Sequence, residues 1–196
     1  MNIWTKYGLN ESADGTGNGM LSVMQEVKAR ADRGEYKAPV KINISTWDAD
    51  TRDAILAGAA LDPFESTLGF CHSYGGAGTI REAKQLGDDV LFDELIGIEC
   101  VTRLFWGQFK FNSWNLSNNI EKATFYYQRN STVPILSSLI RNLGDGNYKN
   151  VDLSAERING RPVDHCKICQ SQTIRTAVLD AVNFWTDHEA EMRVAA

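Results

Sequence analysis

Hydrophobic positions along the chain alternate between short extended runs and stretches with helical spacing. The extended runs, which are typical of strands, cover residues 2–7, 40–45, 67–71, 95–101 and 120–128. Helical spacing fills the intervals between the first four runs, at residues 20–31, around 55–59 and at 79–86. Strands separated by helices in this way favour an α/β architecture, with a mostly parallel central sheet and helices on both faces.

Capping residues and the C-terminal segment refine this arrangement. Gly34 supplies a stop after the first helix, and Asp48 or Asp50 is placed to cap the second. Residues 135–143 have a weaker pattern that permits a short helix. The last helix has one apolar face, formed by Ile174, Val178, Val182 and Trp185. We expect one domain spanning residues 1–196, because a chain of this length can bury a core without dividing.

Composition and charge narrow the classes of function. The 20 basic and 25 acidic side chains give a formal net charge of −5, which argues against a nucleic-acid binder. No apolar run approaches the ~18 residues that a transmembrane helix needs, and the first residues lack the pattern of a secretory signal. Four cysteines are too few for a disulfide scaffold, so we expect reduced thiols and a cytoplasmic location.

A serine lies where the strand at 67–71 gives way to a helix. Residues 71–75 read C-H-S-Y-G, and small residues two positions on either side of Ser73 permit a sharp strand-to-helix turn. Such a turn exposes the serine hydroxyl and puts the N–H of Tyr74 at a helix N-terminus, where a developing oxyanion is favoured. The segment resembles the nucleophile elbow of the α/β-hydrolase superfamily, usually G-x-S-x-G, with Cys71 in place of the first glycine.

A serine nucleophile requires a base, and the chain has three histidines. His72 adjoins Ser73 and is expected to point away from it, while His188 lies in the polar C-terminal part. His165 precedes the last helix, similar to the loop where α/β-hydrolases carry their catalytic histidine. We therefore expect His165 to be the base.

The third member of such a site is a carboxylate that orients the histidine. Glu99 ends the run at 95–101 and resembles the strand-end acid of lipase-like relatives, although those usually carry Asp followed by Pro. Asp145 and Asp152, after the run at 120–128, match the more usual position and stay open as alternatives. We prefer Glu99, because the end of a strand places a side chain more reliably than a long loop does.

The resemblance has further implications for the site and the substrate. It implies a second oxyanion-hole donor, the backbone N–H of Leu9, with the amide of Asn10 beside it. It also implies a small, cutinase-like or minimal lipase/esterase-like fold without a lid domain. The expected activity is hydrolysis of a carboxylic ester through an acyl-enzyme on Ser73, without a metal or organic cofactor. Aromatic residues within 105–127 suggest that this small-molecule ester has an apolar moiety.

Two functions of other classes stay open. Cys166 and Cys169 form a C-x-x-C pair, which suits thiol chemistry or half of a zinc site, although a second such pair is missing. Alternatively, the chain is a non-catalytic hydrolase-like binding module whose triad residues are not aligned. The departures from the family pattern at Cys71 and Glu99 are compatible with that alternative.

Overall fold

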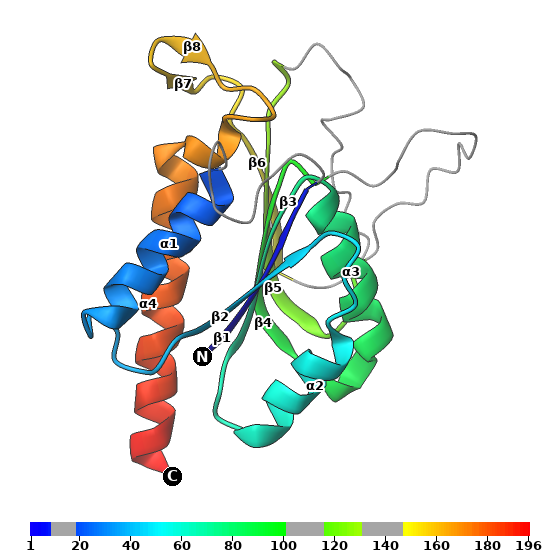
Figure 1. The fold of residues 1–196 in the computed structure, drawn as a ribbon, viewed down its shortest axis with the longest axis vertical. Helices are drawn as coiled ribbons and strands as arrows, with labels where there is room; N and C mark the ends of the chain where they lie inside the picture. Colours follow the sequence, from blue (N-terminus) through cyan, green and yellow to red (C-terminus); the bar gives the residue numbers. More distant parts are fainter. Residues whose placement is uncertain (9–18, 101–115, 131–146) are drawn as a thin grey trace.

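A six-stranded sheet, parallel throughout, forms the centre of the molecule in the computed structural model (Figure 1). The structure describes residues 1–8, 19–100, 116–130 and 147–196. The spatial order of the strands is β2-β1-β3-β4-β5-β6. Their bounds are β1 (Asn2–Tyr7), β2 (Lys41–Thr46), β3 (Thr67–His72), β4 (Phe92–Ile98), β5 (Ile120–Tyr127) and β6 (Asn147–Asp152). The parallel sheet predicted from the sequence is confirmed.

Helices cover both faces of this sheet, as predicted (Figure 1). One face carries α1 (Gly19–Asp32) and α4 (Gln172–Ala195), and the other carries α2 (Arg52–Leu61) and α3 (Tyr74–Leu86). Successive side chains of a strand point to opposite faces. Phe70 of β3 accordingly joins the apolar cluster under α1 and α4, whereas Cys71 joins the cluster under α2 and α3. Each face of the sheet therefore has a core of its own.

Two 3-10 helices and a hairpin complete the described chain. A 3-10 helix, η1 (Gly87–Asp89), follows α3, and another, η3 (Ile168–Gln170), precedes α4. An antiparallel hairpin made of β7 (Arg157–Ile158) and β8 (Arg161–Pro162) lies beyond the carboxyl end of the sheet (Figure 1). The short helix predicted at 135–143 lies outside the described residues.

The starts of two helices differ from the prediction. α3 begins at Tyr74, directly after Ser73, and not at residue 79, because the glycines there form its first turns. The N-cap residue of α2 is Thr51 and not Asp48 or Asp50. Asp50 still contributes to this helix start, because its Oδ1 accepts from Arg52 N (3.2 Å), the first N–H of α2. The buried carboxylate of Glu82 holds Thr51 in place, because it accepts hydrogen bonds from Thr51 N (2.9 Å) and Thr51 Oγ1 (2.8 Å).

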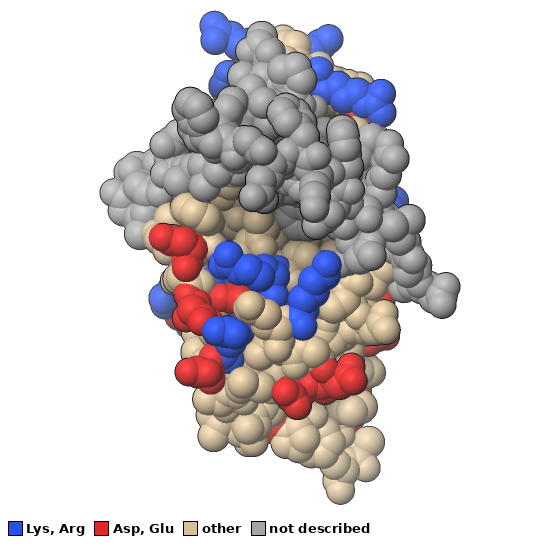
Figure 2. Space-filling view, turned by 90° about the vertical axis from the view of Figure 1, so that its right-hand side faces the viewer, with Lys and Arg blue, Asp and Glu red and all other residues tan. Residues whose placement is uncertain are grey.

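Two properties of the molecule bear on what it could bind: the distribution of charge on its surface and the hydropathy of its helices. On the face that carries α2 and α3, basic and acidic side chains are interspersed (Figure 2). Within the described ranges, no helix has both the length and the apolar character that crossing a membrane requires.

Candidate active site

Ser73 occupies a sharp turn between β3 and α3. Its backbone has φ 54° and ψ −126°, a conformation that residues other than glycine rarely adopt. Hydrogen bonds hold the turn on both sides: Ser73 N donates to Ile98 O (3.0 Å), and Ser73 O accepts from Gly76 N (3.1 Å). The serine therefore lies at the carboxyl edge of the sheet, at the N-terminus of a helix.

Two glycines let the end of β1 pack directly against this turn. A Cβ added at Gly75 would lie 2.1 Å from Lys6 O, and one added at Gly8 would lie 3.0 Å from Ser73 Oγ. The same position at Gly8 is 3.6 Å from Tyr74 N. Gly8 itself therefore lies beside both the serine and the first N–H of α3. Leu9 and Asn10, the other predicted oxyanion-hole residues, lie outside the described residues.

Cys71 fits the turn because its side chain is directed into the core. It is fully buried, and its sulfur lies 3.7 Å from Cys100 Sγ. Room for the Cys100 sulfur beside it comes from Gly76 and Gly97, where an added Cβ would lie 2.4 Å and 2.7 Å from Cys100 Sγ. The departure from the usual glycine at this position is thus accommodated by glycines elsewhere.

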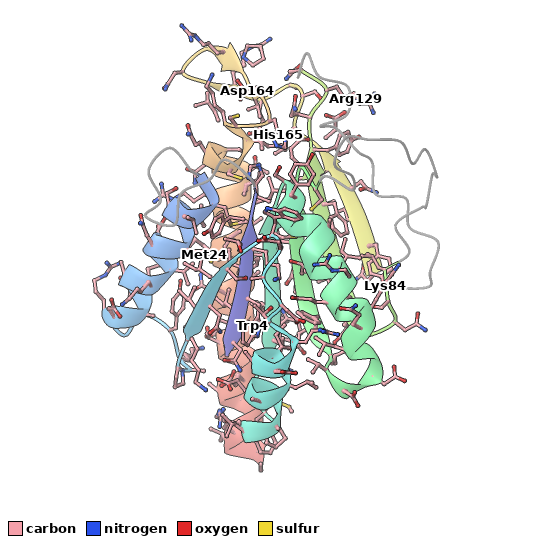
Figure 3. All side chains as sticks on the ribbon, turned by 45° about the vertical axis from the view of Figure 1, so that its right-hand side comes forward. Trp4, Met24, Lys84, Arg129, Asp164 and His165 are labelled. Atoms are coloured by element: carbon pink, nitrogen blue, oxygen red, sulfur yellow. The ribbon has the colours of Figure 1, made fainter. Side chains whose placement is uncertain are left out.

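His165 lies between Ser73 and Glu99 and contacts both. Its Nε2 is 3.0 Å from Ser73 Oγ, and its Nδ1 is 3.2 Å from Glu99 Oε2. A carboxylate can only accept, so Nδ1 carries the proton and Nε2 is left to accept from the serine hydroxyl. Figure 3 shows His165 at the carboxyl end of the sheet, in the loop that leads into η3 and α4. The structure thus brings together the three side chains selected from the sequence.

Glu99 follows β4 directly and is buried, with 1% of its surface exposed. Its φ of 44° turns the chain at the strand end, and Glu99 N donates to Tyr126 O (2.8 Å). The carboxylate accepts from Gln128 N (2.8 Å) and Gln128 Nε2 (2.9 Å) as well as from His165. A buried carboxylate needs such donors to offset the cost of leaving water.

Gln128 is a member of the site that the sequence analysis missed. It is fully buried directly after β5, and both its backbone and its side chain donate to Glu99. The sequence did contain a signal for Gln128: it is a polar residue at the end of a buried strand. Such positions meet at the carboxyl edge of a parallel sheet, where sites form.

The alternative acids are placed differently. Asp152 ends β6, where its carboxylate accepts from Ser154 N (2.9 Å) and pairs with Arg129 Nε (3.3 Å). The structure does not bring it into contact with His165. Asp145 lies outside the described residues.

The C-x-x-C pair has two different environments: Cys166 is exposed and Cys169 is buried. In the part of the chain that the structure describes, no group of three or more His, Cys, Asp or Glu side chains could hold a metal ion. Elsewhere, a hydrogen bond with Cys71 and burial raise the pKa of the Cys100 thiol. Only the thiolate is nucleophilic, so burial and a raised pKa both slow the reaction of a cysteine.

We expect Cys166 to be alkylated first when the folded protein is treated with iodoacetamide. Cys71, Cys100 and Cys169 are buried and should react only after unfolding in urea. Intact-mass measurements over time would show a single modification before the others, and that first modification should be missing in Cys166→Ser. Early modification of Cys71 or Cys100 would contradict the buried dithiol.

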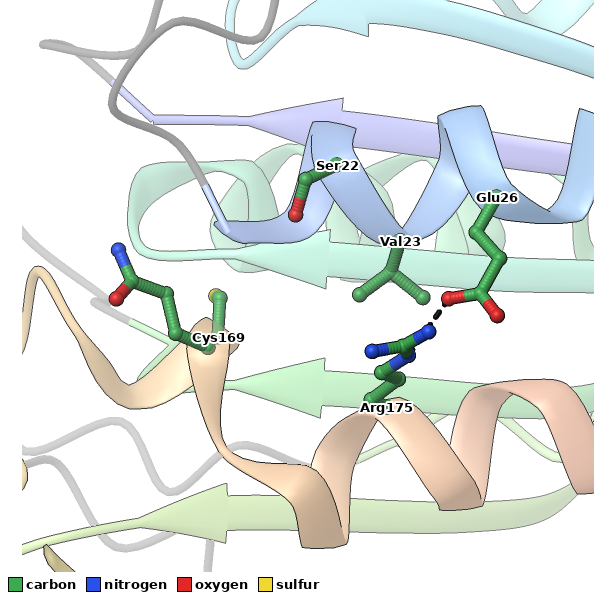
Figure 4. A pocket seen from close by; sticks show the side chains of 6 residues that line it. Ser22, Val23, Glu26, Cys169 and Arg175 are labelled. Carbon is green, nitrogen blue, oxygen red and sulfur yellow. Dashed lines mark ion pairs between the residues drawn. The ribbon is translucent and has the colours of Figure 1, made fainter. Parts of the chain in front are cut away.

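A cavity of about 320 Å³ lies elsewhere, between α1 and the start of α4 (Figure 4). An ion pair between Glu26 Oε2 and Arg175 Nε (2.6 Å) spans it. Ser73, His165 and Glu99 are not among its lining residues, which are Ser22, Val23, Glu26, Cys169, Gln170 and Arg175. This cavity is therefore separate from the site around Ser73.

Comparison with protein-family models and with curated proteins finds no match. Among solved structures, a Xanthomonas campestris pv. campestris protein assigned to the α/β hydrolase superfamily is 10% identical, with a TM-score of 0.43 over 100% of this chain and 99% of that one. Human thioesterase 2 is 9% identical, with a TM-score of 0.49 over 96% of this chain and 97% of that one. The parallel sheet, the turn at Ser73 and the chain order serine, acid, histidine give this protein an α/β-hydrolase-like fold.

Proposed function

We propose that the protein is a serine hydrolase that cleaves a carboxylic ester through an acyl-enzyme on Ser73. The observation that carries this proposal is the continuous chain of contacts from Ser73 Oγ through His165 to Glu99, at 3.0 Å and 3.2 Å. A serine hydroxyl becomes a nucleophile when a base within hydrogen-bond reach takes its proton, and a third group must orient that base. A binding module without catalytic function would have no need of this alignment.

In the proposed reaction, His165 Nε2 takes the proton of Ser73 as Oγ attacks the ester carbonyl carbon. The tetrahedral oxyanion accepts a hydrogen bond from Tyr74 N–H, at the first turn of α3. His165 then gives the proton to the departing alkoxide, which leaves as an alcohol. Water, deprotonated by the same base, attacks the acyl carbon, the bond to Ser73 Oγ breaks, and His165 returns the proton to Oγ as the acid leaves. Glu99 stabilises the imidazolium that forms in each half.

Residues beside Ser73 support an apolar group in the substrate. The rings of Trp47 and Tyr74 are both partly buried and form a tilted pair with centroids 5.9 Å apart. Trp47 follows β2 and Tyr74 follows Ser73, so both lie at the carboxyl edge of the sheet, where open parallel sheets bind ligands. A small-molecule ester with an apolar acyl or alcohol group fits this surface. A cytoplasmic location stays a prediction from the cysteine content.

Labelling with a fluorophosphonate tests the nucleophile. We expect intact-mass analysis to show one covalent adduct on the wild type and none on Ser73→Ala or His165→Ala, because both are needed for activation. Ser154→Ala is the matched control, since Ser154 bonds to Arg129 N and Asp152 and not to His165. An adduct that persists on Ser73→Ala, or none on folded wild type, would overturn the proposal. Turnover of p-nitrophenyl esters of increasing chain length would then define the acyl group.

A further inference from the structure

His72 is a buried histidine that the proposed reaction does not use. It ends β3 directly before Ser73, and only 4% of its surface is exposed. Strand alternation puts its side chain on the same face as Phe70, under α1 and α4. The loop of His165 reaches the sheet on this face, because Val163 and Ile168 belong to the same apolar cluster as Phe70.

His72 contacts His165 at two points. The two imidazole rings stack with centroids 5.1 Å apart and an interplanar angle of 29°. His72 Nε2 also lies 3.2 Å from the backbone oxygen of His165. A carbonyl oxygen can only accept, so His72 carries a proton on Nε2 and donates it to this bond. One side chain thus holds both the ring and the peptide group of His165.

Other bonds fix the two ends of the loop that carries His165. Asn130 Nδ2 donates to Val163 O (3.0 Å), and Asp164 O accepts from Ile168 N (2.9 Å). Rotation of the peptide between His165 and Cys166 would still tilt the imidazole. A tilt would disturb the contacts to Ser73 Oγ and Glu99 Oε2 together, because the two ring nitrogens move as one rigid body.

We infer that His72 is a positioning residue, which fixes the ring and backbone of His165 so that it can act on Ser73. This inference rests on the proposed hydrolase function. Misplacement of a reacting group by about 1 Å can cost on the order of 100-fold in rate. The hydrogen bond from His72 to the His165 carbonyl therefore affects turnover more than it affects substrate binding.

Two substitutions separate the hydrogen bond from the stacked ring. His72→Phe keeps a ring of similar size and removes the donor, whereas His72→Gln keeps an amide N–H near the position of Nε2. We expect His72→Phe to lower kcat by roughly 10- to 100-fold with KM within about twofold. His72→Gln should retain kcat within about threefold of the wild type, since it restores the donor. Rates are to be measured where urea unfolding shows each variant to be fully folded.

Matched substitutions at His188 provide the control. His188 is exposed on α4, where it stacks on Phe184. It lies more than three turns into the helix, whereas His165 precedes the helix. His188→Phe and His188→Gln should leave kcat and KM unchanged. If His72→Phe does not fold, His72→Asn replaces it, because the shorter amide stops short of the His165 carbonyl.

The outcomes distinguish this inference from the function on which it rests. Equal kcat values for the Phe and Gln variants, or full activity of His72→Phe, would overturn the positioning role. Activity that survives in Ser73→Ala would overturn the proposed function itself. A loss in the variant without the donor, together with rescue by His72→Gln and no activity in Ser73→Ala, would support both.

Discussion

Glu99→Gln is expected to lower kcat by about 10⁴-fold while the protein stays folded. The amide keeps an oxygen that can accept from Gln128 N, as Oε1 does in the wild type. Its NH2 group would then replace Oε2 and face His165 Nδ1 and Gln128 Nε2. An NH2 group donates to Nδ1 and selects the tautomer with the proton on Nε2, which cannot accept the serine proton.

The measurement is the steady-state rate with a p-nitrophenyl ester, with circular dichroism and urea unfolding to show that the variant is folded. Asp152→Asn is the matched control, because Asp152 pairs with Arg129 at the end of β6, and its kcat should stay within about twofold. Asp145→Asn tests the remaining candidate in the same assay. A loss of 10⁴-fold in either aspartate variant, with Glu99→Gln active, would make the assignment of Glu99 wrong.

The order of elements could be predicted because the central strands are apolar on both faces. All six positions of β3 are buried, and its middle, residues 68–71, reads L-G-F-C, a run without polar side chains that is typical of a buried strand. β6 was missed for the opposite reason. It is an edge strand of sequence N-Y-K-N-V-D whose side chains are exposed or half-buried, and such a segment has neither an apolar run nor alternation.

The candidate site was predicted as far as local chemistry determines it. Ser73 was selected from the small residues around it, and His165 by elimination among three histidines and by its place before the last helix. Gln128 and the contact of His72 with His165 were not predicted, because both depend on which strand ends lie side by side. The sequence had supplied only the expectation that His72 points away from Ser73.

A buried ion pair connects the elements that support the turn at Ser73. Lys6, near the end of β1, places Nζ 3.0 Å from Glu82 Oε1 of α3, and both side chains are only 4% exposed. Lys6 Nζ also donates to Ala49 O, and Glu82 accepts from Thr51 at the start of α2. Because Lys6 O packs against Gly75, the same residue positions the first turn of α3.

Lys6→Met is expected to lower the free energy of unfolding by about 3–5 kcal/mol. The substitution keeps most of the buried volume but leaves the Glu82 carboxylate in the core without its cation, and a buried charge that has lost its partner is strongly destabilising. Urea unfolding followed by circular dichroism measures the change. Lys28→Met is the matched control, because its pair with Asp32 is 67% and 63% exposed. Its effect should stay within about 0.5 kcal/mol.

The double variant Lys6→Met, Glu82→Gln tests the cause of the loss. Glutamine carries no charge and keeps an oxygen that can accept from Thr51 N, so the bond to the residue before α2 is preserved. Replacing a buried ion pair by neutral groups of similar volume is often close to neutral. We therefore expect the double variant to recover most of the stability that Lys6→Met loses. If instead it is less stable than Lys6→Met alone, the loss comes from packing around Lys6 and not from the unpaired carboxylate.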